Sequence, residues 1–166
     1  MFLYPKAYFT SVKDITIEFL KENNIKALIL DVDNTILDFD RNILKGADKW
    51  CEDLKKQGIK FCILSNSNKY DKVKKAADIL NLPYFCLATK PLKRGFKKAL
   101  KELQVKKENV AAVGDQIFTD VLGANRFKIY SILVKPIGEK DILTTRLKRP
   151  LEKFIIEKYK KSLKKK

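Results

Sequence analysis

The chain has 166 residues, a length typical of one domain, and its 45% hydrophobic content is ordinary for a globular protein. Its three cysteines form no CxxC pair and it has no histidine, which argues against a zinc site and a disulfide framework. No window approaches the roughly 18 apolar residues of a membrane-spanning helix. The N-terminus lacks the pattern of a signal peptide, so we expect a cytoplasmic protein. The net charge of +16 indicates an anionic partner: a lipid surface, a nucleic acid or a phosphorylated substrate.

Apolar runs alternate with amphipathic stretches along the chain, after a first segment, residues 1–10, that is expected to pack on the body or to enter a membrane interface. This alternation predicts one Rossmann-like α/β domain over residues 1–157, with a parallel five-stranded sheet and helices on both faces. Helices are predicted at 12–23, 47–57, 69–80, 92–103 and 119–125, and strands at 27–32, 59–64, 83–88, 109–113 and 129–134.

Polar side chains follow four of the predicted strands, at the point where each strand ends. The carboxyl ends of parallel strands meet at one edge of the sheet, where ligands bind, so we expect these side chains to lie close together. Each group also has a simpler explanation, as a turn, a helix cap or a solvated lysine. The candidates are Asp31 and Asp33 after the first strand, Ser65 and Asn66 after the second, Lys90 after the third, and Asp115 and Asp120 after the fourth.

The candidate residues supply the parts that phosphoryl transfer needs. A carboxylate can attack phosphorus and become an aspartyl phosphate. A second carboxylate, Asp33, can protonate the leaving oxygen and then activate water. Asp31, Asp115 and Asp120 offer only oxygen ligands, which suits Mg²⁺. The predicted phosphate ligands are Ser65, Asn66 and Lys90.

In this order and spacing, the candidates resemble the haloacid dehalogenase superfamily of phosphohydrolases. Its DxDxT motif is matched by DVDNT at 31–35, its serine by LSNS, its lysine by TKP and its acidic pair by GDQIFTD. The resemblance implies that Asp31 is the nucleophile and Asp33 the general acid and base. It also implies Mg²⁺ held by Asp31, the backbone carbonyl of Asp33 and Asp115, with Asp120 ligating or supporting.

Longer segments are similar to the narrower YqeG-type subfamily, which includes bacterial proteins and mitochondrial phosphatidylglycerophosphate phosphatases. The segments include YPKAYFTSVKDIT, GDQIFTDVLGANR and TTRLKRPLE, and the similarity covers about residues 4–155. It implies dephosphorylation of phosphatidylglycerophosphate to phosphatidylglycerol. Two alternatives remain open. One is a phosphatase of a nucleic acid 3′-phosphate, a nucleotide or a sugar phosphate, and the other is a non-catalytic phospho-acceptor or binding module.

Two features favour a phosphate carried on a large molecule. Residues 35–61 and 66–84 are too few for a cap domain, so the site should be open. At the C-terminal end, apolar residues recur at helical spacing among lysines, which is typical of helices that lie on anionic membranes; packing on the domain is the alternative. We therefore expect a cytoplasmic protein that contacts the inner face of the membrane, with a basic tail at 158–166. The apolar residues are Leu147, Leu151, Phe154, Ile155 and Tyr159.

Overall fold

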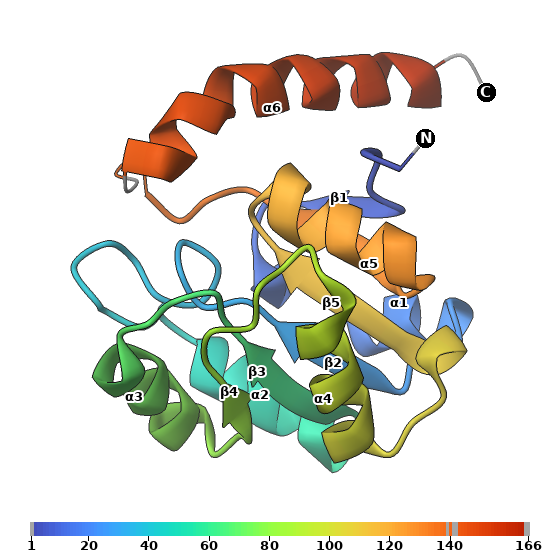
Figure 1. Cartoon of the computed structure of the whole chain (residues 1–166). Coiled ribbons are helices and arrows are strands. Elements are labelled where there is room, and N and C mark those ends of the chain that lie inside the picture. The colour runs from blue at the N-terminus through green and yellow to red at the C-terminus, as the bar shows by residue number, and fades with distance from the viewer. Residues whose placement is uncertain (1, 139, 141–142, 165–166) are drawn as a thin grey trace.

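Six parallel strands form a single sheet in the computed structural model, which describes residues 2–138, 140 and 143–164 (Figure 1). The strand order is β1-β6-β5-β2-β3-β4, so β2 lies in the interior of the sheet between β5 and β3. The strands are β1 (Ala7–Phe9), β2 (Ala27–Leu30), β3 (Lys60–Leu64), β4 (Tyr84–Phe85), β5 (Val110–Gly114) and β6 (Tyr130–Val134).

Helices cover both faces of the sheet, which confirms the predicted α/β class. The residues of β2 alternate between two cores. Leu28 and Leu30 pack with residues of α1, α2 and α3, whereas Ala27 and Ile29 pack with residues of α4 and α5. The helices are α1 (Ile17–Glu22), α2 (Ala47–Lys56), α3 (Tyr70–Leu80), α4 (Lys93–Leu103), α5 (Leu122–Phe127) and α6 (Leu143–Leu163), with short turns η1 (Val12–Asp14), η2 (Lys107–Asn109) and η3 (Ile117–Val121).

The N-terminal segment differs from the prediction in two ways. Residues 7–9 form β1, a sixth strand that pairs with β6, where the sequence predicted five strands and a packed segment. Three residues are too few to show the alternation by which a strand is recognised. The single helix predicted at 12–23 is divided into η1 and α1. The division occurs because the Thr16 side chain accepts a hydrogen bond from the N–H of Phe19 at 3.2 Å and so caps a new helix.

The site edge of the sheet carries no inserted cap. Between β2 and β3 the chain forms a small turn, with bridges from Leu37 to Asp33 and to Ile43, and then α2. Between β3 and β4 it forms only α3. The structure describes both segments throughout, so the prediction of an uncapped domain is confirmed.

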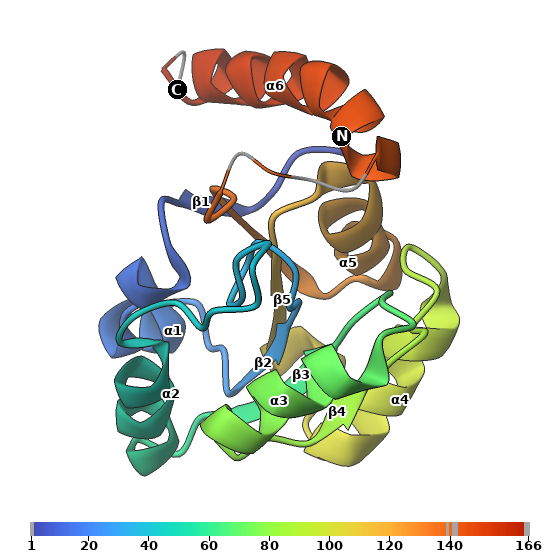
Figure 2. The ribbon, with the colours of Figure 1, turned by 90° about the vertical axis from the view of Figure 1, so that its left-hand side faces the viewer.

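Helix α6 lies on the outside of the molecule, across one edge of the domain (Figures 1 and 2). Ile155 packs in a third core cluster with Ile117, Val121 and Leu133. The helix passes residue 157 without a break and continues to Leu163, so the described part of the predicted basic tail forms its last turns. Among the described residues, every helix is too short or too polar to span a membrane.

Candidate active site

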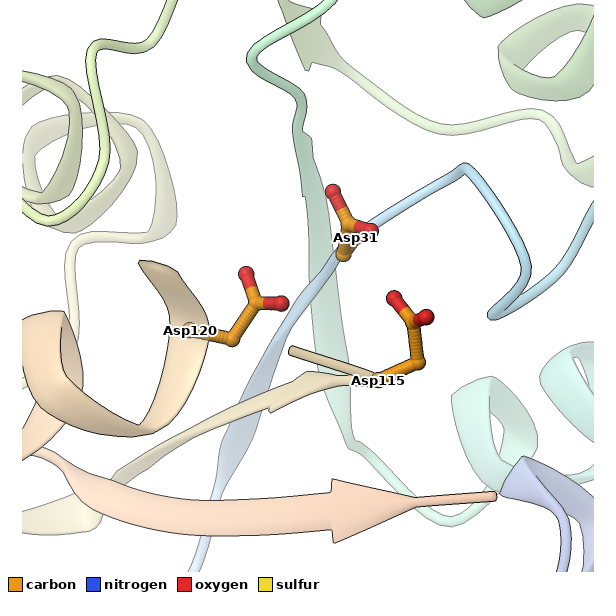
Figure 3. Close-up of side chains that lie close together, drawn as sticks. All are labelled: Asp31, Asp115 and Asp120. Atoms are coloured by element: carbon orange, nitrogen blue, oxygen red, sulfur yellow. The ribbon is translucent and has the colours of Figure 1, made fainter. Parts of the chain in front are cut away.

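Three buried carboxylates meet where β2 and β5 end (Figure 3). Leu30 pairs with Val113 in the register of β2 and β5, so Asp31 and Asp115 leave neighbouring strands at nearly the same level. Asp120 comes from η3, the turn that follows β5. Oxygen atoms of the three carboxylates lie within 4.8 Å of one another. The structure therefore brings together the three acidic side chains that the sequence predicted as metal ligands.

The position of Asp120 depends on a glycine and on a wide turn. η3 is a turn of π-helix. The Asp120 side chain is fixed further because its Oδ2 accepts a hydrogen bond from the N–H of Gln116 at 3.2 Å. A Cβ atom at Gly114 would overlap with the Asp120 carboxylate. Only glycine at 114 thus leaves room for this carboxylate beside Asp31 and Asp115.

Lys90 is the buried cation at the centre of the cluster. Its Nζ donates to Asp31 Oδ1 at 2.7 Å and to Asp120 Oδ1 at 2.6 Å. Burial alone would lower the pKa of Lys90, but the two carboxylates outweigh it and the pKa is raised. Burial raises the pKa of Asp31 to about 7, although Lys90 acts in the opposite direction. The site thus holds negative charge that a bound cation would stabilise.

The loop that carries Lys90 is held by Asn66. Asn66 Oδ1 accepts a hydrogen bond from the N–H of Lys90 at 2.7 Å, and its Nδ2 donates to the Lys90 carbonyl at 2.9 Å. Ser65 is buried, and its Oγ accepts from the N–H of Ser67 at 3.1 Å. Asn66 therefore positions Lys90. The phosphate contacts predicted for Asn66 and Ser65 stay predictions.

Asp33 lies apart from the three-carboxylate cluster. Its side chain is 41% exposed and forms an ion pair with Lys72 of α3, whose side chain is largely buried. Both residues line the pocket in front of Asp31. A carboxylate in this position is open to solvent and beside the entrance, as a general acid and base must be.

Two residues beside the cluster that the sequence reasoning did not single out come from α6. Arg149 donates from Nη1 to the Asp115 carbonyl at 3.0 Å and forms an ion pair with the Asp115 carboxylate through Nη2. Its Nη1 also donates to Glu152 Oε2 at 3.1 Å. Glu152 Oε1 accepts from the N–H of Ile117 at 2.7 Å, at the start of η3. In the sequence, only the TTRLKRPLE segment that carries the family resemblance pointed to these two residues. Their contacts at Asp115 and Ile117 lie more than thirty residues away along the chain, so no local pattern indicates them.

Asp115 is buried between other carboxylates and Arg149. Burial is the main reason that its pKa is raised well above the ordinary value, with the Asp31 charge acting in the same direction and Arg149 in the opposite one. The Asp115 Oδ1 atom also accepts a long hydrogen bond of 3.5 Å from the Thr35 hydroxyl. Buried carboxylates of raised pKa with oxygen donors only are the chemical setting that suits a hard divalent cation.

A pocket of about 680 Å³ opens in front of Asp31 and Asp33. Its lining is rich in cations, which suits an anionic ligand. The apolar side chains of Phe39 and Leu87 lie among them and are about half exposed. The basic residues that line it are Arg41, Lys69, Lys72, Lys90 and Lys148.

Comparison with known proteins identifies the family. A family model described as haloacid dehalogenase-like hydrolase matches residues 40–128. The probable phosphatase YqeG of Bacillus subtilis (strain 168) is 38% identical over 161 residues, covering 96% of this chain and 93% of that protein. The chain belongs to the haloacid dehalogenase-like hydrolases. The predicted resemblance to YqeG-type phosphatases, and with it the predicted enzyme class, is confirmed.

Solved structures share the fold of this hydrolase at low sequence identity. The magnesium-bound putative hydrolase YfnB of Bacillus subtilis has a TM-score of 0.59 at 13% identity, covering 72% of this chain and 91% of that one. An uncharacterized protein of Listeria monocytogenes serotype 4b has a TM-score of 0.58 at 22% identity, covering 72% and 85%. The cobalt-bound deoxy-D-mannose-octulosonate 8-phosphate phosphatase of Haemophilus influenzae has a TM-score of 0.55 at 16% identity, covering 86% and 93%.

Proposed function

We propose that this hydrolase removes the terminal phosphate of phosphatidylglycerophosphate, yielding phosphatidylglycerol, in a Mg²⁺-dependent reaction with an aspartyl-phosphate intermediate. The observation that carries the proposal is the cluster of three buried carboxylates and Lys90 at the base of an uncapped, basic pocket. The similarity to YqeG-type phosphatases supports it.

Mg²⁺ would be held by the carboxylates of Asp31, Asp115 and Asp120, together with the backbone carbonyl of Asp33. When bound, it would neutralise charge on the phosphate oxygens. The donor set fits this ion because it is buried, acidic and made of oxygen atoms alone. Arg149 holds the Asp115 carboxylate in place, and Lys90 holds those of Asp31 and Asp120.

In the first step, an Asp31 carboxylate oxygen bonds to phosphorus while the bond from phosphorus to the alcohol oxygen breaks. Asp33 gives its proton to that oxygen, so the lipid leaves as a neutral alcohol. In the second step, Asp33 takes a proton from water, and the water oxygen displaces Asp31 from phosphorus. Inorganic phosphate leaves, and both side chains return to their starting states. The Lys90 ammonium, the Ser65 hydroxyl and Asn66 would bind or position the phosphoryl group during both steps.

The open pocket favours a phosphate on a large anionic molecule. No cap covers the pocket among the described residues, and five basic side chains line it. A phospholipid head group presented at a membrane surface meets both conditions, and the enzyme would then work at the cytoplasmic side of the bilayer. We retain residues 1–157 as the proposed phosphatase domain, with a basic tail after it whose exposed lysines would face the membrane.

Phosphate release from phosphatidylglycerophosphate in mixed micelles tests the proposal. A 3′-phosphorylated oligonucleotide and an aryl phosphate serve as parallel substrates, with chelator in place of Mg²⁺ as the control. We expect Mg²⁺-dependent release with a strong preference for the lipid. Preference for the oligonucleotide would replace the lipid by a nucleic acid substrate, and turnover of the aryl phosphate alone would retain the mechanism but reject the lipid. No release from any substrate would favour a non-catalytic module.

A further inference from the structure

The C-terminal helix α6 has a broad apolar side, and the domain covers only the part of it around Ile155 and Tyr159. On the inner face, Ile155 and Tyr159 are buried, and the Tyr159 ring meets the Tyr4 ring edge to face with centroids 5.7 Å apart. Glu152, on the same face, is buried against the N–H of Ile117. These contacts fix how the helix is rotated about its axis and therefore which side chains face outward.

The outer face presents a stripe of large apolar side chains to solvent. They stand four, four and three residues apart, the spacing that places side chains on one side of a helix. The stripe extends for about 16 Å at the usual rise per residue. None of the four belongs to a core cluster of the described residues. The residues and their exposed fractions are Leu143 (72%), Leu147 (75%), Leu151 (54%) and Phe154 (52%).

The exposed charges of α6 are mainly cations, although the Lys160 ammonium packs on the domain, 4.9 Å from the centroid of the Tyr8 ring. Of the exposed charged side chains of α6, six are basic and only Glu157 is acidic. The ammonium of Lys158 lies 4.5 Å from the centroid of the Phe154 ring, at the edge of the stripe. An apolar stripe flanked by lysines is complementary to an anionic lipid surface, whose acyl chains and head groups take up the two kinds of side chain. The six are Arg146, Lys148, Lys153, Lys158, Lys160 and Lys161.

The same helix borders the active-site pocket. Thr145 and Lys148, from its first turns, line the pocket together with Phe39 and Leu87, the half-exposed apolar residues of the facing loops. Figure 2 shows α6 along the top of the molecule, above the loop that follows β2. A partner that binds the exposed side of α6 would therefore lie close to the pocket that contains Asp31.

We propose that the outer face of α6 docks on an anionic lipid bilayer, with Leu143, Leu147, Leu151 and Phe154 in the interfacial layer and the lysines at the head groups. This inference extends the proposed lipid phosphatase function and rests on it. It separates the roles of the two faces, because the inner face attaches the helix to the catalytic cluster and the outer face attaches it to the membrane.

Co-sedimentation of the full chain with vesicles of phosphatidylcholine and phosphatidylserine tests the docking. Neither lipid is a phosphomonoester or the proposed product, so binding through the active site does not contribute. The test variant is Leu147→Ser with Leu151→Ser. The matched control is Ile79→Ser, which replaces an exposed apolar residue of α3. Hydrolysis of a soluble aryl phosphate is measured for each protein as a control for an intact active site. None of the three positions belongs to the catalytic cluster, so this rate should not change.

We expect the wild type and the control to bind the vesicles, more weakly at high salt, and the double variant to bind about tenfold more weakly. Aryl phosphate hydrolysis should be equal in all three proteins. Wild-type protein that stays in the supernatant, or a double variant that binds as tightly as wild type, would overturn the docking. If the wild type forms a dimer and does not bind vesicles, and the double variant is a monomer, the exposed face of α6 would instead bind a second copy of the chain.

The failures of the two proposals differ. Hydrolysis of phosphatidylglycerophosphate micelles without vesicle binding would reject the docking and keep the proposed function. Vesicle binding by an enzyme that releases no phosphate from that lipid would reject the substrate and keep the docking.

Discussion

The two sides of the active site differ in how much buried structure holds their residues in place. On the sheet side, Asp31 and Asp115 continue strands whose residues are all buried, so the core fixes their positions. On the other side, Arg149 and Glu152 belong to a helix whose outer face is exposed and whose inner face buries few side chains. The sheet side should therefore tolerate loss of a polar group without movement, whereas the α6 side depends on its polar contacts.

The largest effect is expected on the sheet side, in catalysis. Asp31→Asn removes the nucleophile and should lower the rate of aryl phosphate hydrolysis by at least about a thousandfold. The thermal midpoint of the metal-free protein should not fall, because an amide at this buried position carries no charge to desolvate. Asp53→Asn, on the exposed face of α2, is the control. Activity near the wild-type rate would remove Asp31 from the mechanism.

Arg149→Met should show how far the cluster depends on α6. Without the guanidinium, Asp115 loses its cationic partner in a buried site, and the free energy of unfolding in chelator should fall by about 3–5 kcal/mol. Saturating Mg²⁺ should restore part of this loss, because it supplies positive charge to the same carboxylate. Denaturant titrations with and without Mg²⁺ measure both values, and Arg146→Met, an exposed change on the same helix, is the control.

An equal loss in chelator and in Mg²⁺ would show that Arg149 anchors the helix without contributing to the charge balance of the metal site. A loss no larger than that of the control would contradict the importance of the contact.

Glu152→Ala should weaken the attachment of α6 in a way that a metal does not repair. It leaves the buried N–H of Ile117 without its acceptor, which should cost about 1–3 kcal/mol in the free energy of unfolding. The same titrations with and without Mg²⁺ should give the same loss. Glu157→Ala, an exposed acid one turn later, should change stability by no more than about 0.5 kcal/mol. A Mg²⁺-dependent loss would place Glu152 in the metal site.

The smallest change is expected for Lys72→Met, at the outer edge of the sheet side. Its partner Asp33 is partly exposed, so water can replace the lysine, and the free energy of unfolding should change by less than about 1 kcal/mol. Chemical denaturation with Lys69→Met as the control measures this difference. A loss as large as that of Arg149→Met would show that Asp33 is as dependent on its cation as Asp115.

The sequence predicted the sheet side much better than the α6 side, for a physical reason. Asp31, Lys90 and Asp115 follow apolar runs, and the geometry of parallel strands brings such positions together. Arg149 and Glu152 have no comparable local signal, because a polar residue on a helix indicates its partner only once the helix is docked. The spacing of the α6 apolar residues likewise predicted a helix, but not that Leu147, Leu151 and Phe154 would stay exposed while Ile155 and Tyr159 are buried.

The π-helical turn at η3 makes the site sensitive to chain length. Val121 donates to the Gln116 carbonyl five residues before it, at 3.3 Å, so this turn accommodates one residue more than an ordinary helical turn. Removal of one residue between 117 and 121 would allow a regular helix, and the residues beyond it would rotate by about 100°. Asp120 would then leave the cluster even if its identity were kept. A relative that lacks one residue between 117 and Asp120 is therefore expected to have a different acidic centre.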